Sequence, residues 1–333
     1  MDEVSLSHEL PVIAGFIAFV VVMLVLDLKV FQRRAHVIGI KESLLWAGFW
    51  IALSLLINLG VYFWRGPDTA LQFFTGYLIE LSLSVDNLFV FLLIFTYFAV
   101  PAVHQHKVLF WGILGAVVMR LTFIVAGVAL IAKFHWVLYI FGAFLILTSI
   151  RMALQKDRKI DPGRNPVLRL FRRFMPVTDD YEGDRFFIKR AGRNIATPLF
   201  VVLLVIETTD VIFATDSVPA VLGITLDPFV VFSSNVCAIL GLRALYFALA
   251  GIMKMFRYLS YGLVVVLFFI GVKMLVGGGY DMPVSIALGV VATVLLLSVL
   301  ASIVKSRREN SLPGPSSPPH GEAPPGPEGP SGK

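Results

Sequence analysis

Five acidic side chains stand inside long apolar stretches of this chain. They are Glu80, Asp86, Glu207, Asp210 and Asp216. A carboxylate near the centre of a membrane-spanning helix costs about 2.5–3.5 kcal/mol to insert, even on the lenient scales. Five of them would cost on the order of 10 kcal/mol unless they are paired, hydrated, protonated or bound to a metal. The acids therefore predict a functional site.

Small polar residues follow two of these acids directly, since Asn87 comes after Asp86 and Ser217 after Asp216. Carboxylate, amide and hydroxyl oxygens form a hard-oxygen site, which suits Mn²⁺, Mg²⁺ or Ca²⁺. A zinc or copper(I) site is disfavoured, because there is no cluster of His and Cys and the single cysteine, Cys237, stands alone in an apolar run. Protons remain a competing cargo, because buried carboxylates in proton-coupled carriers have the same residue types.

Three cationic residues, Arg120, Arg243 and Lys273, also fall within apolar stretches. As buried ion-pair partners they would give the acids a purely structural role. Three cations cannot neutralise five carboxylates, however, so we expect them to balance charge or to gate the site. Asn235 lies near Arg243, and its position is as consistent with helix packing as with a place in the site.

The composition is that of a membrane protein. Hydrophobic residues make up 57% of the 333 residues and charged residues only 15%, against about a quarter in a soluble domain. The mean hydropathy is +0.84. The apolar runs are long and continuous, which favours helices over barrel strands. They cover residues 10–30, 43–64, 69–100, 108–132, 136–153, 197–224, 228–253, 259–276 and 283–304. The predicted fold is all-α and polytopic, with about nine transmembrane helices.

Lysine and arginine are distributed unevenly between the two ends of these predicted helices. With the N-terminus outside, twelve of them between Arg151 and Arg193 face the cytoplasm, whereas the outer side keeps only Arg65 and Lys133. The positive-inside rule then places the C-terminus in the cytoplasm. This distribution explains the net charge of +6 without nucleic acid as a partner.

Residues 1–310 are expected to form a transmembrane domain with a basic cytoplasmic loop at about 154–196. The loop is predicted to contain a short amphipathic helix at 166–174 and to lie on anionic membrane lipid. A role in binding partner proteins is an alternative for the loop, and the sequence identifies no protein partner. Residues 311–333 are rich in Pro, Gly and Ser, which predicts a disordered tail.

An internal repeat relates two parts of the chain. Two segments share an acid, a second acid six positions later and a small polar residue after it: Glu80, Asp86 and Asn87, and then Asp210, Asp216 and Ser217. Cationic residues follow both segments in the same order: Arg120 and Arg151, and then Arg243 and Lys273. The third to fifth and the sixth to eighth spans would form an inverted repeat, as in many secondary transporters whose sites lie near the membrane midplane.

The spacing of the acids raises a geometric problem. Two residues six positions apart on a regular helix point about 120° away from each other. A site that uses both is easier to build from interrupted helices, and Pro219 predicts unwound backbone at 214–219 with carbonyls turned to an ion. A pseudo-two-fold axis could then bring Asp86 and Asp216 to one shared site.

The same residues resemble a known family, the TerC/Alx family of bacterial membrane proteins. The resemblance rests on Glu80-x5-Asp86-Asn87, Glu207-x2-Asp210-x2-Phe213-Ala214-x-Asp216-Ser217-Val-Pro-Ala220, Ser234-Asn235 with Ala238-Ile-Leu-Gly-Leu-Arg243, and Gly271-x-Lys273-Met274. It extends from the first span to the ninth. It implies a role in divalent metal homeostasis, with manganese export as the expected activity.

Together these features predict a secondary transporter that exports a divalent cation, Mn²⁺ first, across the bacterial inner membrane. Asp86, Asp210 and Asp216 are the first candidate ligands, and Glu80, Glu207, Asn87 and Ser217 follow them. We expect no permanently bound cofactor and no enzymatic activity, and the chain has no Walker motif for an ATP-driven pump. The rival interpretation is a non-transporting, metal-binding membrane scaffold that presents its basic loop to partner proteins.

Overall fold

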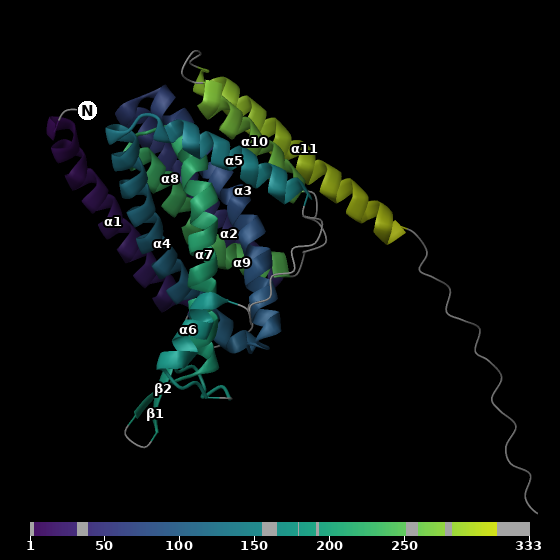
Figure 1. Ribbon diagram of the computed structural model, residues 1–333. Coiled ribbons are helices and arrows are strands. Elements are labelled where there is room, and N and C mark those ends of the chain that lie inside the picture. The colour runs from purple at the N-terminus through teal and green to yellow at the C-terminus, as the bar shows by residue number, and fades with distance from the viewer. Residues whose placement is uncertain are drawn as a thin grey trace, which may run out of the picture.

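The computed structural model describes residues 3–31, 39–154, 165–178, 180–190, 193–250, 259–276 and 282–311. Helices dominate it, and a single β-hairpin lies between α6 and α7 (Figure 1). The elements are α1 (Glu3–Phe31), α2 (Ile40–Arg65), α3 (Pro67–Tyr97), α4 (Ala102–Lys133), α5 (Val137–Leu154), α6 (Pro166–Phe174), β1 (Phe187–Arg190), β2 (Arg193–Ala196), α7 (Pro198–Leu222), α8 (Pro228–Leu240), α9 (Leu242–Ala250), α10 (Leu259–Val276) and α11 (Val284–Ser311).

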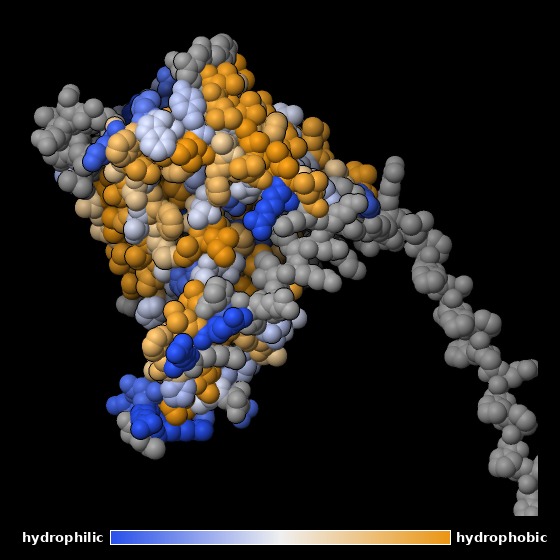
Figure 2. Space-filling view, in the orientation of Figure 1, coloured by the Kyte–Doolittle hydropathy of each residue, from blue (hydrophilic) through white to orange (hydrophobic). Residues whose placement is uncertain are grey.

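Eight spans among the described residues are long and apolar enough to cross a membrane, with α8 and α9 together forming one of them. The first helix, α1, adds a shorter apolar stretch, Pro11–Leu26. The prediction of an all-α, polytopic membrane protein with about nine helices is confirmed. Figure 2 shows the matching surface, with apolar side chains over the helical body and hydrophilic ones gathered around α6 and the hairpin.

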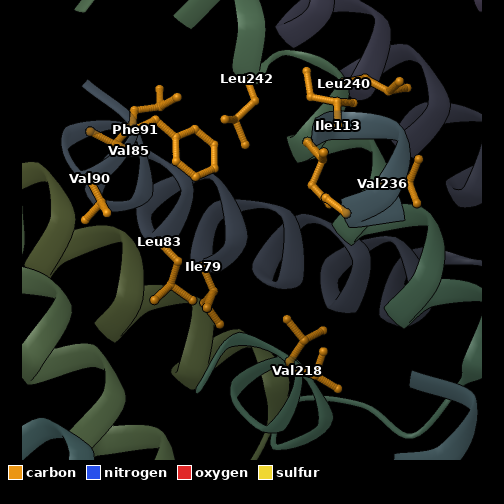
Figure 3. Packing of buried hydrophobic residues seen from close by; sticks show 14 of the residues in the cluster. Ile79, Leu83, Val85, Val90, Phe91, Ile113, Val218, Val236, Leu240 and Leu242 are labelled. Carbon is orange, nitrogen blue, oxygen red and sulfur yellow. The ribbon is translucent and has the colours of Figure 1, made fainter. Parts of the chain in front are cut away.

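Two spans form the centre of the bundle. In an 18-residue apolar stretch of each span, 94% of the residues are buried in the α8–α9 span and 67% in α3, but only 22% in α2 and in α11. The third helix packs against α8 and α7, α4 packs along α7, and α5 packs along α10. Figure 3 shows part of the apolar core, to which α3 contributes Ile79, α4 Ile113, α7 Val218 and α8 Val236.

Proline and glycine set several of the helix boundaries. Pro67, Pro198 and Pro228 each stand in the first turn of a helix, where the missing N–H is not needed. Gly66 joins α2 to α3 with a backbone φ of +91°, which residues with a side chain rarely adopt. Asp227 caps α8 by accepting from the backbone N–H of Val230.

The described residues between α5 and α7 pack against one end of the bundle. The helix predicted at 166–174 is confirmed as α6, and Phe171 from this helix packs on Phe200 in the first turn of α7. Lys107 of α4 donates to the backbone oxygen and the carboxylate of Asp184, at 2.5 and 3.0 Å. The pKa of Asp184 is lowered by this hydrogen bond and by the charge of Lys107. The predictions for the tail and for residues 155–164 of the loop lie outside the described residues.

The third and seventh helices run antiparallel. Near the hairpin, the hydroxyl of Tyr181 donates to the carbonyl of Phe98 just after α3, while α7 begins directly after β2. At the opposite end, the hydroxyl of Thr225, just after α7, donates to Gln72 in the second turn of α3. The C-terminal direction of α3 therefore leads toward one end of the bundle, and that of α7 leads toward the other end.

Candidate functional site

A polar stripe runs along the buried face of α3. Glu80, Ser84 and Asn87 follow one another at helical spacing, and all three are buried, so their side chains lie on one face. On α7 the corresponding positions hold Asp210 and Ser217, which are seven residues apart and both buried. The two stripes supply the acids nearest the middle of their helices.

Arg120 of α4 joins the two stripes. Its side chain is fully buried, and its Nη1 forms an ion pair with Oε1 of Glu80. Its Nη2 lies 3.4 Å from Oδ1 of Asp210. Neutral oxygens complete its surroundings, with Oγ of Ser217 at 3.1 Å and Oδ1 of Asn235 at 3.4 Å from Nη1. We call these five residues from four helices the Arg120 cluster.

The two carboxylates of the Arg120 cluster are bound unequally. Oε1 of Glu80 accepts from Arg120, and its Oε2 accepts from Nδ2 of Asn235 at 2.9 Å. Asp210 has only the long contact at Oδ1, and its buried Oδ2 has no hydrogen-bond partner among the described residues. Two carboxylates and one guanidinium give the cluster a formal charge of −1. An uncompensated buried charge is costly, so Oδ2 of Asp210 is an acceptor available to a cation or a proton.

The other three acids lie outside this cluster. Asp86 is half-buried, and its Oδ1 accepts from the hydroxyl of Ser260 at the start of α10, at 2.8 Å. Asp216 is also half-buried. Glu207 is half-buried, and its carboxylate occupies the space beside Gly115 of α4 where a β-carbon would otherwise lie. Only an unsubstituted backbone admits the Glu207 carboxylate at this position.

Asp86 and Asp216 lie at different depths, which corrects the expectation of one site shared by both. Asp86 is six residues beyond Glu80 along α3, and Asp216 is six residues beyond Asp210 along α7. Six residues of helix rise about 9 Å. Because the helices are antiparallel and both central acids contact Arg120, the other two acids are displaced in opposite directions, about 18 Å apart along the bundle.

The candidate metal ligands are not gathered in a cage. Within the described part of the chain, no three side chains of His, Cys, Asp or Glu come together as metal ligands would. Of the predicted site residues, the structure brings together Glu80, Asp210, Ser217, Arg120 and Asn235. It places Asp86, Asn87, Glu207 and Asp216 elsewhere along the same two helices.

The predicted interruption of the sixth span is wrong. Helix α7 continues from Pro198 to Leu222 with Pro219 inside it, and a proline in a membrane helix is tolerated when neighbouring helices support it. An interruption falls instead in the next span, at Gly241 between α8 and α9. Arg243 follows two residues later and is buried.

Lys273 contacts the end of α7. Its side chain is half-buried, and Nζ donates to the carbonyl oxygen of Gly223 at 3.0 Å. Gly223 is the C-cap of α7, so Lys273 binds the end of a helix where carbonyls lack partners and a positive charge is favourable. The structure gives it a capping interaction and no acidic partner among the described residues.

Three residues at or near the acids were not predicted from the sequence. Ser84 could have been found, because it lies four residues after Glu80 and three before Asn87, within one helical stripe. Gly115 and Ser260 have no comparable signal. Each matters only because a second helix, α7 or α3, brings an acid against it.

The fold and the cluster define an integral membrane protein of many helices with buried ionic groups at its centre. The description "Integral membrane protein TerC family" matches residues 65–310, and the chain belongs to this family. The resemblance seen in the sequence motifs is thereby confirmed.

Similar proteins cover nearly the whole chain. The "Uncharacterized membrane protein STKORF319" of Myxococcus xanthus is 50% identical over 88% of this chain and 92% of its own length. Two proteins named "Putative membrane-bound redox modulator Alx" are also similar. The one from Salmonella typhi is 46% identical over 90% of this chain and 96% of its own length. The one from Escherichia coli K12 is 44% identical over the same shares. No solved structure matches the chain.

Proposed function

We propose that this TerC-family protein is a secondary transporter that exports divalent metal cations, Mn²⁺ first, across the bacterial inner membrane. The observation that carries the proposal is the Arg120 cluster, because it holds a formal charge of −1 and an unpartnered carboxylate oxygen in the centre of a membrane protein. Such a charge in an apolar interior requires a cation or a proton to offset it. In a purely structural ion pair, the positive and negative charges would instead be equal in number.

The ligand chemistry supports a hard divalent cation. The other oxygens around Arg120 belong to a carboxylate, a hydroxyl and an amide, from Glu80, Ser217 and Asn235. Mn²⁺, Mg²⁺ and Ca²⁺ prefer such oxygens. The single cysteine, Cys237, is buried in α8, which does not favour a soft thiolate site or an exposed redox-active thiol.

Helix packing supports an inverted repeat, and with it alternating access. A two-fold axis that exchanges α3 with α7, α4 with the α8–α9 span and α5 with α10 would turn the α3–α8 contact into the α7–α4 contact. It would leave the α5–α10 contact unchanged. All three contacts are present, and the Arg120 cluster lies where α3, α4, α7 and α8 meet, as expected for a site at a repeat interface.

The proposed orientation has the N-terminus outside and the α6 end of the bundle in the cytoplasm. We further propose that α6 lies on anionic lipid of the inner leaflet. Leu170 and Phe174 expose apolar surface, while Arg169 and Arg173 are exposed at other positions around the same helix. Apolar insertion combined with arginine contacts to phosphate is typical of interfacial helices.

The alternative is a metal-binding scaffold that transports nothing. The exposed Leu170 and Phe174 of α6 favour it, because the same surface could receive a partner protein. The name of the Alx relatives, redox modulator, describes an effect that a transporter or a scaffold could each produce.

Purified protein in liposomes separates the two functions. Wild-type protein should admit external Mn²⁺ to a fluorescent indicator inside, and Asp210→Asn should lower the initial rate at least about tenfold. The matched control is Asp184→Asn, which removes an exposed acid of the loop and should leave the rate unchanged. Wild-type protein that binds Mn²⁺ but passes none would establish the scaffold instead.

A further inference from the structure

We propose that Arg120 competes with the transported cation for the carboxylates of the Arg120 cluster. In the metal-free state, Arg120 occupies these carboxylates. Asp210 is then the carboxylate that releases Arg120 first, and Glu80 is its permanent anchor. The inference rests on the proposed function, since it concerns how the same site receives its cargo.

The unequal bonding of the two acids gives the order of events. Glu80 holds Arg120 by a close ion pair, and its second oxygen is fixed by Asn235. Asp210 lies at 3.4 Å from the guanidinium, near the outer limit for a hydrogen bond. The weaker contact is the one that an entering cation displaces at lower cost.

Neutral acceptors make that displacement feasible. Ser217 and Asn235 both offer oxygens to Nη1 of Arg120. A guanidinium that loses Asp210 therefore keeps several of its contacts, and it is not left as an isolated buried charge. Both oxygens contact Nη1, whereas Asp210 contacts Nη2, so Arg120 retains hydrogen bonds while the metal gains a carboxylate.

The arrangement also limits how tightly a cation binds. Without Arg120, the two acids would present a formal charge of −2 to a divalent ion in a medium of low dielectric, where Coulomb attraction is strong. With Arg120 present, the formal charge is −1. A carrier must release its cargo, and a resident arginine that returns to Asp210 favours release.

Equilibrium binding of Mn²⁺ to the full-length protein in nanodiscs tests this competition. Affinity should follow the formal charge of the cluster. Arg120→Gln, with a charge of −2, should bind at least about tenfold more tightly than wild type. Asp210→Asn, with a charge of 0, should bind at least about tenfold more weakly. Arg65→Gln, which removes a cation paired with Asp227 at the end of α2, is the control and should bind as wild type does.

A second variant keeps the test decisive if Arg120→Gln does not fold. Glu80→Gln combined with Arg120→Gln restores a charge of −1 and removes both members of the close ion pair. It should still bind Mn²⁺, more weakly than Arg120→Gln where that variant can be measured. A folded Arg120→Gln that binds no more tightly than wild type overturns the proposal, as does a folded double variant that binds nothing.

Measurements of Mn²⁺ flux test the proposed transport, and measurements of Mn²⁺ binding separately test the role of Arg120. Wild-type protein that binds Mn²⁺ without passing it would end the proposed transport, while the affinity order would still decide the role of Arg120. Under both proposals, Arg120→Gln in liposomes should combine tighter binding with a turnover at least about threefold lower, because release is slowed. Tighter binding with unchanged turnover would refute the role of Arg120 in release.

Discussion

Helices α5 and α10 cross at two glycines, and replacing one of them tests the packing of the bundle. A β-carbon at Gly271 would lie 2.8 Å from the carbonyl oxygen of Gly142 and 3.1 Å from the backbone nitrogen of Ile146. A β-carbon at Gly142 would in turn lie 2.9 Å from the carbonyl oxygen of Gly271. The obstacles are backbone atoms, which cannot rotate away, so Gly271→Ala must push the two helices apart.

The cost follows from overpacking. An extra methyl group in a well-packed core costs about 1–3 kcal/mol, while alanine gains roughly 0.5–1 kcal/mol over glycine within a helix. Gly289→Ala on α11 is the matched control, because a β-carbon added there would meet nothing within 4 Å. The gain in helix propensity is common to both variants and cancels. The difference between them should therefore be about 1–3 kcal/mol.

The buried thiol of Cys237 provides the assay, since it is the chain's single cysteine and reacts with a dye only when the bundle opens. During heating in detergent, Gly271→Ala should react at a lower midpoint temperature than Gly289→Ala. One kcal/mol corresponds to about 2–4 °C in a domain of 150–250 residues, so a difference of several degrees is expected. Equal midpoints would refute the close crossing of α5 and α10.

Two further predictions concern the acids and the orientation. Gly115→Ala should displace the carboxylate of Glu207 and lower the rate of Mn²⁺ uptake into liposomes by at least about threefold. Gly48→Ala, which has open space around it, is the control and should leave the rate unchanged. An unchanged rate in Gly115→Ala would show that Glu207 is not part of the cation pathway. A cysteine at Arg169 should react with an impermeant maleimide in inverted vesicles only, and one at Lys133 in intact cells only, so the reverse pattern would invert the proposed topology.

Hydropathy was sufficient to predict most of the fold. The span at 259–276 coincides with α10, and the amphipathic helix at 166–174 coincides with α6. The interruption at Gly241 was missed because a single glycine leaves the hydropathy of a span almost unchanged. Pro219 was given too much weight, since neighbouring helices can support a proline that would end a helix in water.

The candidate site was predictable in its residue types but not in its contacts. Sequence spacing identifies which side chains of one helix share a face, and it could have grouped Glu80 with Ser84 and Asn87. It carries no information on which of the three cations within the spans meets which acid. Arg120 meets Asp210 because α4 packs along α7, and it meets Glu80 because α3 packs against the same helices, α7 and α8, within reach of its long side chain.

The alignment of the two proposed repeat halves also depends on tertiary packing. The sequence match aligned Arg151 with Lys273, yet α5 and α10 meet at Gly142 and Gly271. If the two-fold axis passes through that contact, the two glycines are equivalent positions, and Lys273 corresponds to Phe144. The cationic match in the last helix of each half is then coincidental, which agrees with the capping interaction of Lys273.

The six-residue spacing of the acids has a physical explanation that needs no broken helix. One acid of each pair enters the Arg120 cluster, and the other lies about 9 Å further along and about 120° around the helix. Because α3 and α7 are antiparallel, Asp86 and Asp216 fall on opposite sides of the cluster, and together they span about 18 Å of a hydrocarbon core roughly 30 Å thick. In the proposed transporter, a cation entering from either side would then meet one acid before it reaches Arg120. The proposed inverted repeat would thus supply an equivalent approach from each side of the membrane, with the central arginine between the two acids.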